Sequence, residues 1–204
     1  MKYEAEIREL LINNTIHLIA EGGFEKATTK ELTHYGGSIP NFKMNEVYIY
    51  RLFGSKEQLY EAAFQTLEAE IVAAFAQGVD AVGGFELDTK QKLYDFFLRA
   101  WAFVLKNEVR CRCYVRYYYS IYFKANARLV HQRHFGTVIN QMAPLFKEEA
   151  DVSAILHSVF TALLDLAIRV YNGELEDNEV NRPHVFNLLY CMMMTYFKDA
   201  PKVS

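Results

Sequence analysis

The chain has 204 residues, of which 51% are hydrophobic and 15% aromatic, so it can form a core without disulfide or metal support. Its three cysteines form no even-numbered framework and no signal peptide precedes the amphipathic start, which excludes a disulfide-stapled secreted domain and predicts a cytoplasmic protein. Charged residues interrupt every apolar run, so we expect a soluble chain without a membrane span.

The local charge differs from the total charge. A net charge of −3 argues against a nucleic-acid partner, because such proteins usually carry a basic footprint. Between Lys26 and Lys56, however, five basic side chains stand against two acidic ones. A modest basic footprint is therefore present in this part of the chain, where phosphates would bind.

The chain begins with two helices of unequal length. Apolar residues at helical spacing predict one helix over about residues 3–20, ended by Gly22-Gly23. Thr28 or Thr29 then caps a short second helix, because a threonine hydroxyl accepts a hydrogen bond from a first-turn N–H. The glycine- and proline-containing segment Gly36–Lys43 predicts a long turn after it.

A third and a fourth helix follow this turn. Asn45 is expected to cap the third helix, and Ile49 and Phe53 are expected to face inward. Ser55 starts a capping-box pattern for a fourth helix over about residues 55–77. Further helices are predicted over about residues 89–104, from 126 past a bend near Pro144, and over 151–171 and 182–197. An aromatic segment over residues 111–123 lies between the first two of these.

Three short stretches within about the first 60 residues resemble TetR-type (TetR/AcrR) transcriptional regulators. They are Gly23-Phe24, the Thr28-Thr29 pair, and the run from Ile49 through Ser55 to Leu59. The resemblance implies an all-α fold with a helix-turn-helix DNA-binding domain over residues 1–54 and a helical effector-binding and dimerisation domain over 55–204. The turn Gly36–Lys43 departs from the family pattern, since it is longer by about six residues.

The resemblance also implies which residues meet DNA. Hydroxyl and ammonium groups suit phosphate, and amide and guanidinium groups suit base edges. We expect phosphate contacts from Thr29, Tyr50 and Lys56 and base contacts from Asn45, Tyr48 and Arg51, with Lys43 and Glu46 beside them. Glu46 is unusual there, and either accepts from a cytosine amino group or only caps the helix dipole. Taken singly, each residue is better explained as an ordinary surface group, and it is the spaced set within the helix-turn-helix pattern that indicates DNA contact.

The last two helices carry apolar residues around much of their circumference, although a helix on a monomer needs only one apolar stripe. In TetR-type regulators two such helices from each subunit pair as a four-helix dimer interface. We therefore expect a homodimer whose interface includes Leu163, Ala167, Val170, Leu189, Met192 and Met193. A thick internal core is the alternative.

An aromatic cluster in the middle of the chain is a candidate ligand site. Flat rings with hydroxyl tips suit planar or cationic molecules. The candidate residues are Phe97, Trp101, Tyr114, Tyr117, Tyr118, Tyr122 and His131. The alternative is that the rings form core. Residues 90–147 carry 11 basic side chains against two acidic ones, which either bind an anionic effector or offset acidic helices.

Two further patterns suggest sensing chemistry. His131 and His134 lie three apart on a helix, a spacing that suits a metal, but no third ligand accompanies them, and a solvated pair explains them more simply. Cys111 and Cys113 lie beside arginines that lower thiol pKa values, although inert buried thiols are the ordinary case. No phosphate loop, nucleophile elbow or acid–base pair occurs, so we expect neither an enzyme nor a bound cofactor or metal.

These patterns predict a ligand-responsive regulator, a repressor that binds a palindromic double-stranded DNA operator as a homodimer and is released by a small-molecule effector. Two alternatives remain open. One is a helical interaction or ligand-sequestering protein that has lost operator binding, and the other is a thiol- or metal-sensing regulator.

Overall fold

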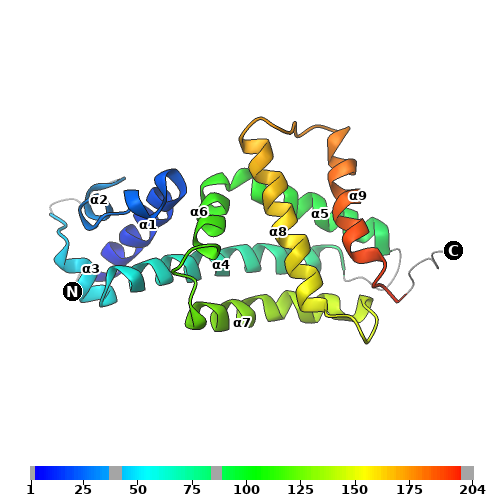
Figure 1. The fold of residues 1–204 in the computed structure, drawn as a ribbon, viewed down its shortest axis with the longest axis horizontal. Helices are drawn as coiled ribbons and strands as arrows, with labels where there is room; N and C mark the ends of the chain where they lie inside the picture. The colour runs from blue at the N-terminus through cyan, green and yellow to red at the C-terminus, as the bar shows by residue number, and fades with distance from the viewer. Residues whose placement is uncertain (1–2, 37–42, 84–88, 199–204) are drawn as a thin grey trace. The chain divides into compact units, whose positions relative to one another are not determined.

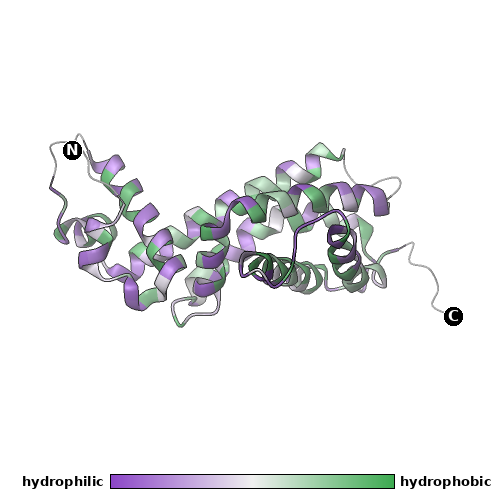
Figure 2. Ribbon diagram, turned by 90° about the horizontal axis from the view of Figure 1, so that it is seen from above, coloured by the Kyte–Doolittle hydropathy of each residue, from purple (hydrophilic) through white to green (hydrophobic). Residues whose placement is uncertain are grey.

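The computed structural model describes residues 3–36, 43–83 and 89–198, and these residues are helical apart from their connecting turns (Figure 1). The predicted all-α class is confirmed. The backbone packs into two compact units, one formed by residues 1–71 and 109–132 and the other by 72–108 and 133–204. We call them unit 1 and unit 2. Most helices carry both hydrophobic and hydrophilic residues along their length (Figure 2).

Unit 1 contains the three N-terminal helices and α6. The helices α1, α2, α3 and α6 span Glu4–Lys26, Thr29–His34, Val47–Phe53 and Glu108–Tyr118. The unit also holds the first parts of α4, which spans Lys56–Ala81, and of α7, which spans Ala125–Met142.

The first helix is longer than the sequence pattern predicts. It continues to Lys26, but Gly23 within it has the non-helical angles φ 76° and ψ −169°. The predicted end at the glycine pair is therefore a kink, because glycine without a Cβ can adopt this positive φ and the chain can then re-enter the helix.

Side-chain caps and one buried amide organise α2. The hydroxyl of Thr28 accepts a hydrogen bond of 3.2 Å from the Glu31 N–H, which confirms the predicted cap. The buried Asn14 side chain on α1 donates 2.9 Å to the Leu32 carbonyl and so attaches α2 to α1. Most of the predicted long turn, residues 37–42, lies outside the described part of the chain.

Unit 2 is built on α5, α8 and α9. They span Thr89–Lys106, Val152–Tyr171 and Asn181–Met194, and α8 packs against both of the others. The second parts of α4 and α7 complete the unit, and a 3-10 turn at Ala143–Leu145, which contains Pro144, ends α7 where the sequence predicted only a bend. The Tyr171 hydroxyl donates to the Val104 carbonyl and connects α8 to α5.

The helix α8 bears on the expectation of a chain without a membrane span. Among the described helices, only α8 is long and apolar enough to cross a membrane by length and composition, although the sequence argument found no such run. The charges that interrupt it, Asp165 and Arg169, pair with each other at 2.9 Å. Its buried face, which includes Phe160, Leu163 and Ala167, shows that α8 is a core helix of unit 2.

Candidate nucleic-acid interface and ligand cavities

The helix α3 presents one apolar and one polar face. Ile49 and Phe53 are buried as predicted, while Tyr50 is 53% exposed. The N-cap residue of α3 is Glu46, one residue after the predicted Asn45, and it makes no side-chain capping bond. The Asn45 side-chain oxygen accepts 3.0 Å from the Val47 N–H at the start of the helix, which uses one of the two acceptor positions of that oxygen. The exposed residues around the helix include Lys43, Asn45, Glu46, Val47 and Arg51, and Tyr48 is half-buried.

The Arg51 guanidinium is held by its neighbours. Its Nη2 lies 3.7 Å from the Glu4 carboxylate on α1, and its Cζ lies 5.1 Å from the centre of the Tyr48 ring. One turn further along α1, Arg8 donates 3.1 Å to the Leu52 carbonyl and lies over the Phe53 ring. The first two turns of α1 therefore fix the last turn of α3.

Two of the candidate phosphate-binding residues, Thr29 and Lys56, begin helices in the same unit. Thr29 is the first residue of α2 and is half-buried, and Lys56 is the first residue of α4. Ser55 caps α4, since its Oγ accepts 3.1 Å from the Gln58 N–H. Lys56 lies 5.6 Å from the centre of the Tyr60 ring, which orients its ammonium group at the helix start.

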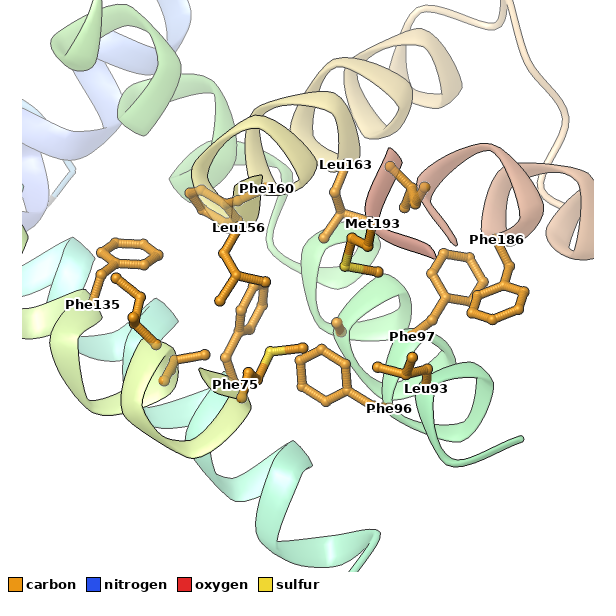
Figure 3. A pocket seen from close by; sticks show the side chains of 15 residues that line it. Phe75, Leu93, Phe96, Phe97, Phe135, Leu156, Phe160, Leu163, Phe186 and Met193 are labelled. Carbon is orange, nitrogen blue, oxygen red and sulfur yellow. The ribbon is translucent and has the colours of Figure 1, made fainter. Parts of the chain in front are cut away.

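An apolar cavity of about 80 Å³ lies within unit 2 (Figure 3). Side chains from α4, α5, α7, α8 and α9 line it, including Phe75, Phe97, Phe135, Phe160 and Phe186. None of its fifteen lining residues carries a charge, so a ligand there would be held by burial of apolar surface rather than by ion pairs.

Only one predicted ligand residue, Phe97, lines this cavity. Trp101, four residues after Phe97 on α5, is buried, and its indole N–H donates 2.9 Å to the Asp177 carboxylate. That carboxylate also binds Arg182 at 2.7 Å, and these bonds hold its pKa below the ordinary value, with Arg182 the larger cause. The acidic turn before α9 is thus anchored to α5.

The predicted dimer residues divide between two environments. Leu163, Leu189 and Met193 line the apolar cavity, and Ala167 is fully buried in its own chain. Val170 and Met192, in contrast, are half-buried. They lie on separate outer stripes: one on α8 formed by Ile155, Val159, Leu166 and Val170, and one on α9 formed by Leu188 and Met192.

The central tyrosines lie in unit 1 and form an aromatic cluster. The Tyr117 ring stacks on Phe64 at 4.3 Å between centroids, and Tyr122 lies 4.5 Å from Phe24 on α1. Tyr114 is buried against Phe64, and burial raises its pKa well above the ordinary value. Most of these rings are therefore core, as the alternative interpretation held.

A second cavity, of about 140 Å³, opens beside this aromatic cluster. Tyr117 and Tyr122 are the two predicted ligand residues that line it. Sequence reasoning missed the polar residues opposite them, Glu57, Gln58, Glu61 and Lys124. The sequence feature that could have indicated them is the pair Glu57 and Glu61, which lie one turn apart on the same face at the start of α4.

His131 takes part in a buried pair that joins α7 to α4. Its Nδ1 lies 2.5 Å from the carboxylate of Glu68, which is 0% exposed. The rings of Tyr118 and Phe123 cover the imidazole at 5.5 and 5.9 Å. Glu68 was not predicted, because an isolated glutamate in a helix ordinarily belongs to the solvated face.

The sensing patterns receive little support. Burial raises the pKa of the Cys113 thiol to about 12, so the neighbouring arginines do not make it a thiolate at neutral pH. Cys111 is also buried. No group of three potential metal ligands occurs within the described ranges of the chain. The Arg110 guanidinium pairs with Glu70 at 2.5 Å, which supports the interpretation that basic residues offset acidic helices.

No protein-family model matches the chain, and no curated protein matches it. Solved structures do match over almost the whole length. A TetR-family regulator from Marinobacter aquaeolei VT8 aligns with a TM-score of 0.73 at 16% identity, covering 94% of this chain and 98% of that one. A putative TetR-family regulator from Shewanella sp. PV-4 gives 0.72 at 17% identity, covering 94% and 98%.

The fatty acid degradation regulator FadR from Bacillus halodurans aligns with a TM-score of 0.63 at 16% identity, covering 90% of this chain and 94% of that one. The resemblance first seen in the helix-turn-helix region thus extends, at the level of backbone structure, through the α5, α8 and α9 helices. The chain has the fold of the TetR-family transcription regulators.

Proposed function

We propose that the protein is a homodimeric transcription regulator that binds an operator through α3 and responds to a small molecule in the apolar cavity. The observation that carries the DNA-binding part is the orientation of α3, which buries Ile49 and Phe53 and leaves Tyr50 and Arg51 exposed. In a helix-turn-helix module such an exposed face enters the major groove. Repression, with release of DNA on ligand binding, is the mode we propose.

The lining of the cavity limits the effector. A charged molecule would lose its hydration without gaining an ionic partner among the fifteen lining side chains. We therefore propose an uncharged, largely apolar effector in unit 2. The structurally similar FadR from Bacillus halodurans is a regulator of fatty acid degradation, a process whose compounds have apolar chains, and this agrees with such an effector.

The half-exposed apolar stripes support the dimer. They provide α8 and α9 with a second apolar face besides the one buried within unit 2. We propose that the interface uses Val170 and Met192 directly, together with the stripe residues Val159, Leu166 and Leu188. The other predicted interface residues, Leu163, Ala167, Leu189 and Met193, would support these stripes from within the core. A two-fold interface would place two α3 helices on a palindrome.

Replacing Lys56 with alanine tests the DNA-binding proposal. Log affinity falls with log salt concentration by about 0.9 per phosphate contact. A homodimer that loses one contact per subunit should therefore show a slope that is less negative by about 1.8. The measurement is a gel-shift or fluorescence titration against the DNA upstream of the protein's own gene at several salt concentrations. Lys106→Ala, an exposed lysine at the end of α5, is the matched control. A folded dimer without affinity for this DNA at low salt would contradict the proposal.

The contact between Glu4 and Arg51 leads to a second prediction. Glu4 and the Tyr48 ring hold the guanidinium in one orientation, and we expect a pre-oriented arginine to discriminate bases better than a free one. Glu4→Gln should therefore raise affinity for random DNA but reduce the preference for selected sequences by about threefold to fivefold, as expected for an exposed ion pair. Selection from a random duplex library with the wild type and the variant measures this preference.

Glu6→Gln provides the control, because it removes the same charge from the same turn of α1 at an exposed position. It should raise affinity for all sequences alike and leave the preference unchanged. If the two variants select sequences equally well, Glu4 contributes only its charge and does not position Arg51.

A further inference from the structure

The polar cavity in unit 1 differs chemically from the apolar cavity in unit 2. Its seven lining residues are Glu57, Gln58 and Glu61 on α4, Tyr117 on α6, and Tyr122, Lys124 and Ala127 further along the chain. Tyr117 and Ala127 are buried and form its floor, whereas Glu57 and Lys124 remain exposed at its opening. The cavity therefore combines an aromatic wall with charged groups.

Two carboxylates face this cavity from consecutive turns of α4. Hydrogen bonds from its own backbone and from Ser55 hold the pKa of Glu57 below the ordinary value, so its carboxylate remains ionised at neutral pH. Glu61 accepts 3.2 Å from the Gln65 side-chain amide, which is a neutral partner. It also lies close enough to Tyr117 to add to the effect of burial in raising the pKa of that phenol.

Lys124 is the basic residue among the seven that line the cavity. Its charge acts on Glu57 and helps to lower the pKa of that carboxylate. Two negative charges and one positive charge therefore surround the space. A ligand with a single positive charge would balance the site.

The aromatic wall favours the same kind of ligand. The face of a tyrosine ring attracts a cation through its quadrupole, and the rings of Phe24 and Tyr60 pack at 4.5 and 5.2 Å from Tyr122 and hold that ring in place. The Tyr117 hydroxyl donates 3.2 Å to the Tyr122 carbonyl, which fixes the second ring relative to the first. Both rings are thus oriented before a ligand arrives.

We propose that this cavity is a second ligand site, which binds a small organic monocation such as a protonated amine on a compact apolar frame. The carboxylates of Glu61 and Glu57 bind the ammonium group, and the rings of Tyr117 and Tyr122 contact the carbon frame. The space of about 140 Å³ is similar to the roughly 150 Å³ of an engineered cavity that holds benzene, so a single six-membered ring with one substituent is a suitable size.

The cavity lies beside residues that contact the C-terminal end of α1. Tyr122 contacts Phe24, which directly follows the kink at Gly23 in α1, and Tyr60 donates 2.8 Å to the Ala27 carbonyl just beyond α1. A molecule that displaces Tyr122 would therefore disturb the end of α1. The site thus offers a way for an amine to act on the helices around α3 without entering the apolar cavity.

Benzylammonium, with uncharged benzyl alcohol as its partner of nearly equal shape, tests the proposal. The full chain is titrated calorimetrically with each compound at constant ionic strength. We expect benzylammonium to saturate one site per chain and to bind about tenfold more tightly than benzyl alcohol, because only the ammonium group pairs with the carboxylates, whereas both compounds place the same ring against Tyr117 and Tyr122. Glu61→Gln should weaken benzylammonium by about fivefold or more, whereas Glu149→Gln, at an exposed position in unit 2, should leave it unchanged.

Three results would overturn the proposal. The first is the absence of saturable binding of benzylammonium to the folded wild-type chain. The second is equal affinity for benzyl alcohol, which would place both compounds in an apolar space. The third is equal affinity of the Glu61→Gln and Glu149→Gln variants. The titration contains no DNA, so its outcome is separate from the outcome of the operator-binding experiments.

Discussion

His131→Ala is expected to lower the free energy of unfolding by about 3–5 kcal/mol. The substitution leaves the Glu68 carboxylate, which is 0% exposed, without the imidazole that now lies 2.5 Å away. A buried carboxyl group that loses a hydrogen-bonding partner costs more than the contacts of the removed side chain alone. Urea unfolding followed by far-UV circular dichroism measures the change.

Two spectroscopic probes can show which unit the substitution destabilises. Trp101 is the single tryptophan and belongs to unit 2, whereas the His131–Glu68 pair belongs to unit 1. Loss of helical signal at lower urea than the change in tryptophan fluorescence would show that unit 1 unfolds first. His184→Ala, at an exposed position on α9, is the control and should change stability by less than about 0.5 kcal/mol.

A double variant separates the lost partner from the lost side chain. Glu68→Met combined with His131→Leu removes both polar groups and fills similar volume, and such replacements of buried pairs are often close to neutral. The double variant should therefore be more stable than His131→Ala. If His131→Ala is no more destabilising than the surface control, the pair does not stabilise unit 1.

Leu188→Arg is expected to convert the proposed homodimer into monomers and to weaken the proposed operator binding by at least about 100-fold. Leu188 is 54% exposed on α9 and lies one turn before Met192 on the outer apolar stripe. An arginine there would place like charges opposite each other across a two-fold interface and would bury them without partners. Size-exclusion chromatography with light scattering gives the mass, and a DNA titration gives the affinity.

Leu129→Arg is the matched control for this substitution. Leu129 is 61% exposed on α7 in unit 1, so the same chemical change is made away from α8 and α9. It should leave the dimer intact. A dimeric Leu188→Arg protein would refute the proposed interface, and a monomeric Leu129→Arg protein would move that interface to unit 1.

The parts of the fold that were predictable depend on short-range chemistry. Thr28, Ser55 and Asp151 each accept a hydrogen bond from an N–H three residues later, and such caps can be recognised without knowledge of the rest of the molecule. The inward positions Ile49 and Phe53 follow from helical spacing alone. The α1 kink was harder, because a glycine pair signals both an end and a bend.

The cavities depend on packing between distant segments and were not predictable in this way. Phe75, Phe135 and Phe160 meet around one cavity although they come from α4, α7 and α8. Likewise, Glu68 is 63 residues from His131, and no local pattern marks it as buried. The tyrosine cluster was correctly seen as a group, but sequence spacing does not separate rings that fill a core from rings that line a space.

The backbone at Gly23 also constrains how this protein can evolve. A side chain at this position would be strained at φ +76°, and its Cβ would lie 3.2 Å from the Arg116 guanidinium. At Gly22 an added Cβ would lie 2.6 Å from Cδ and 2.8 Å from Cβ of Lys26, and the Lys26 Cβ cannot move aside unless the backbone shifts. Among descendants of this sequence, both positions should therefore stay glycine, position 22 for lack of space and position 23 for its backbone conformation.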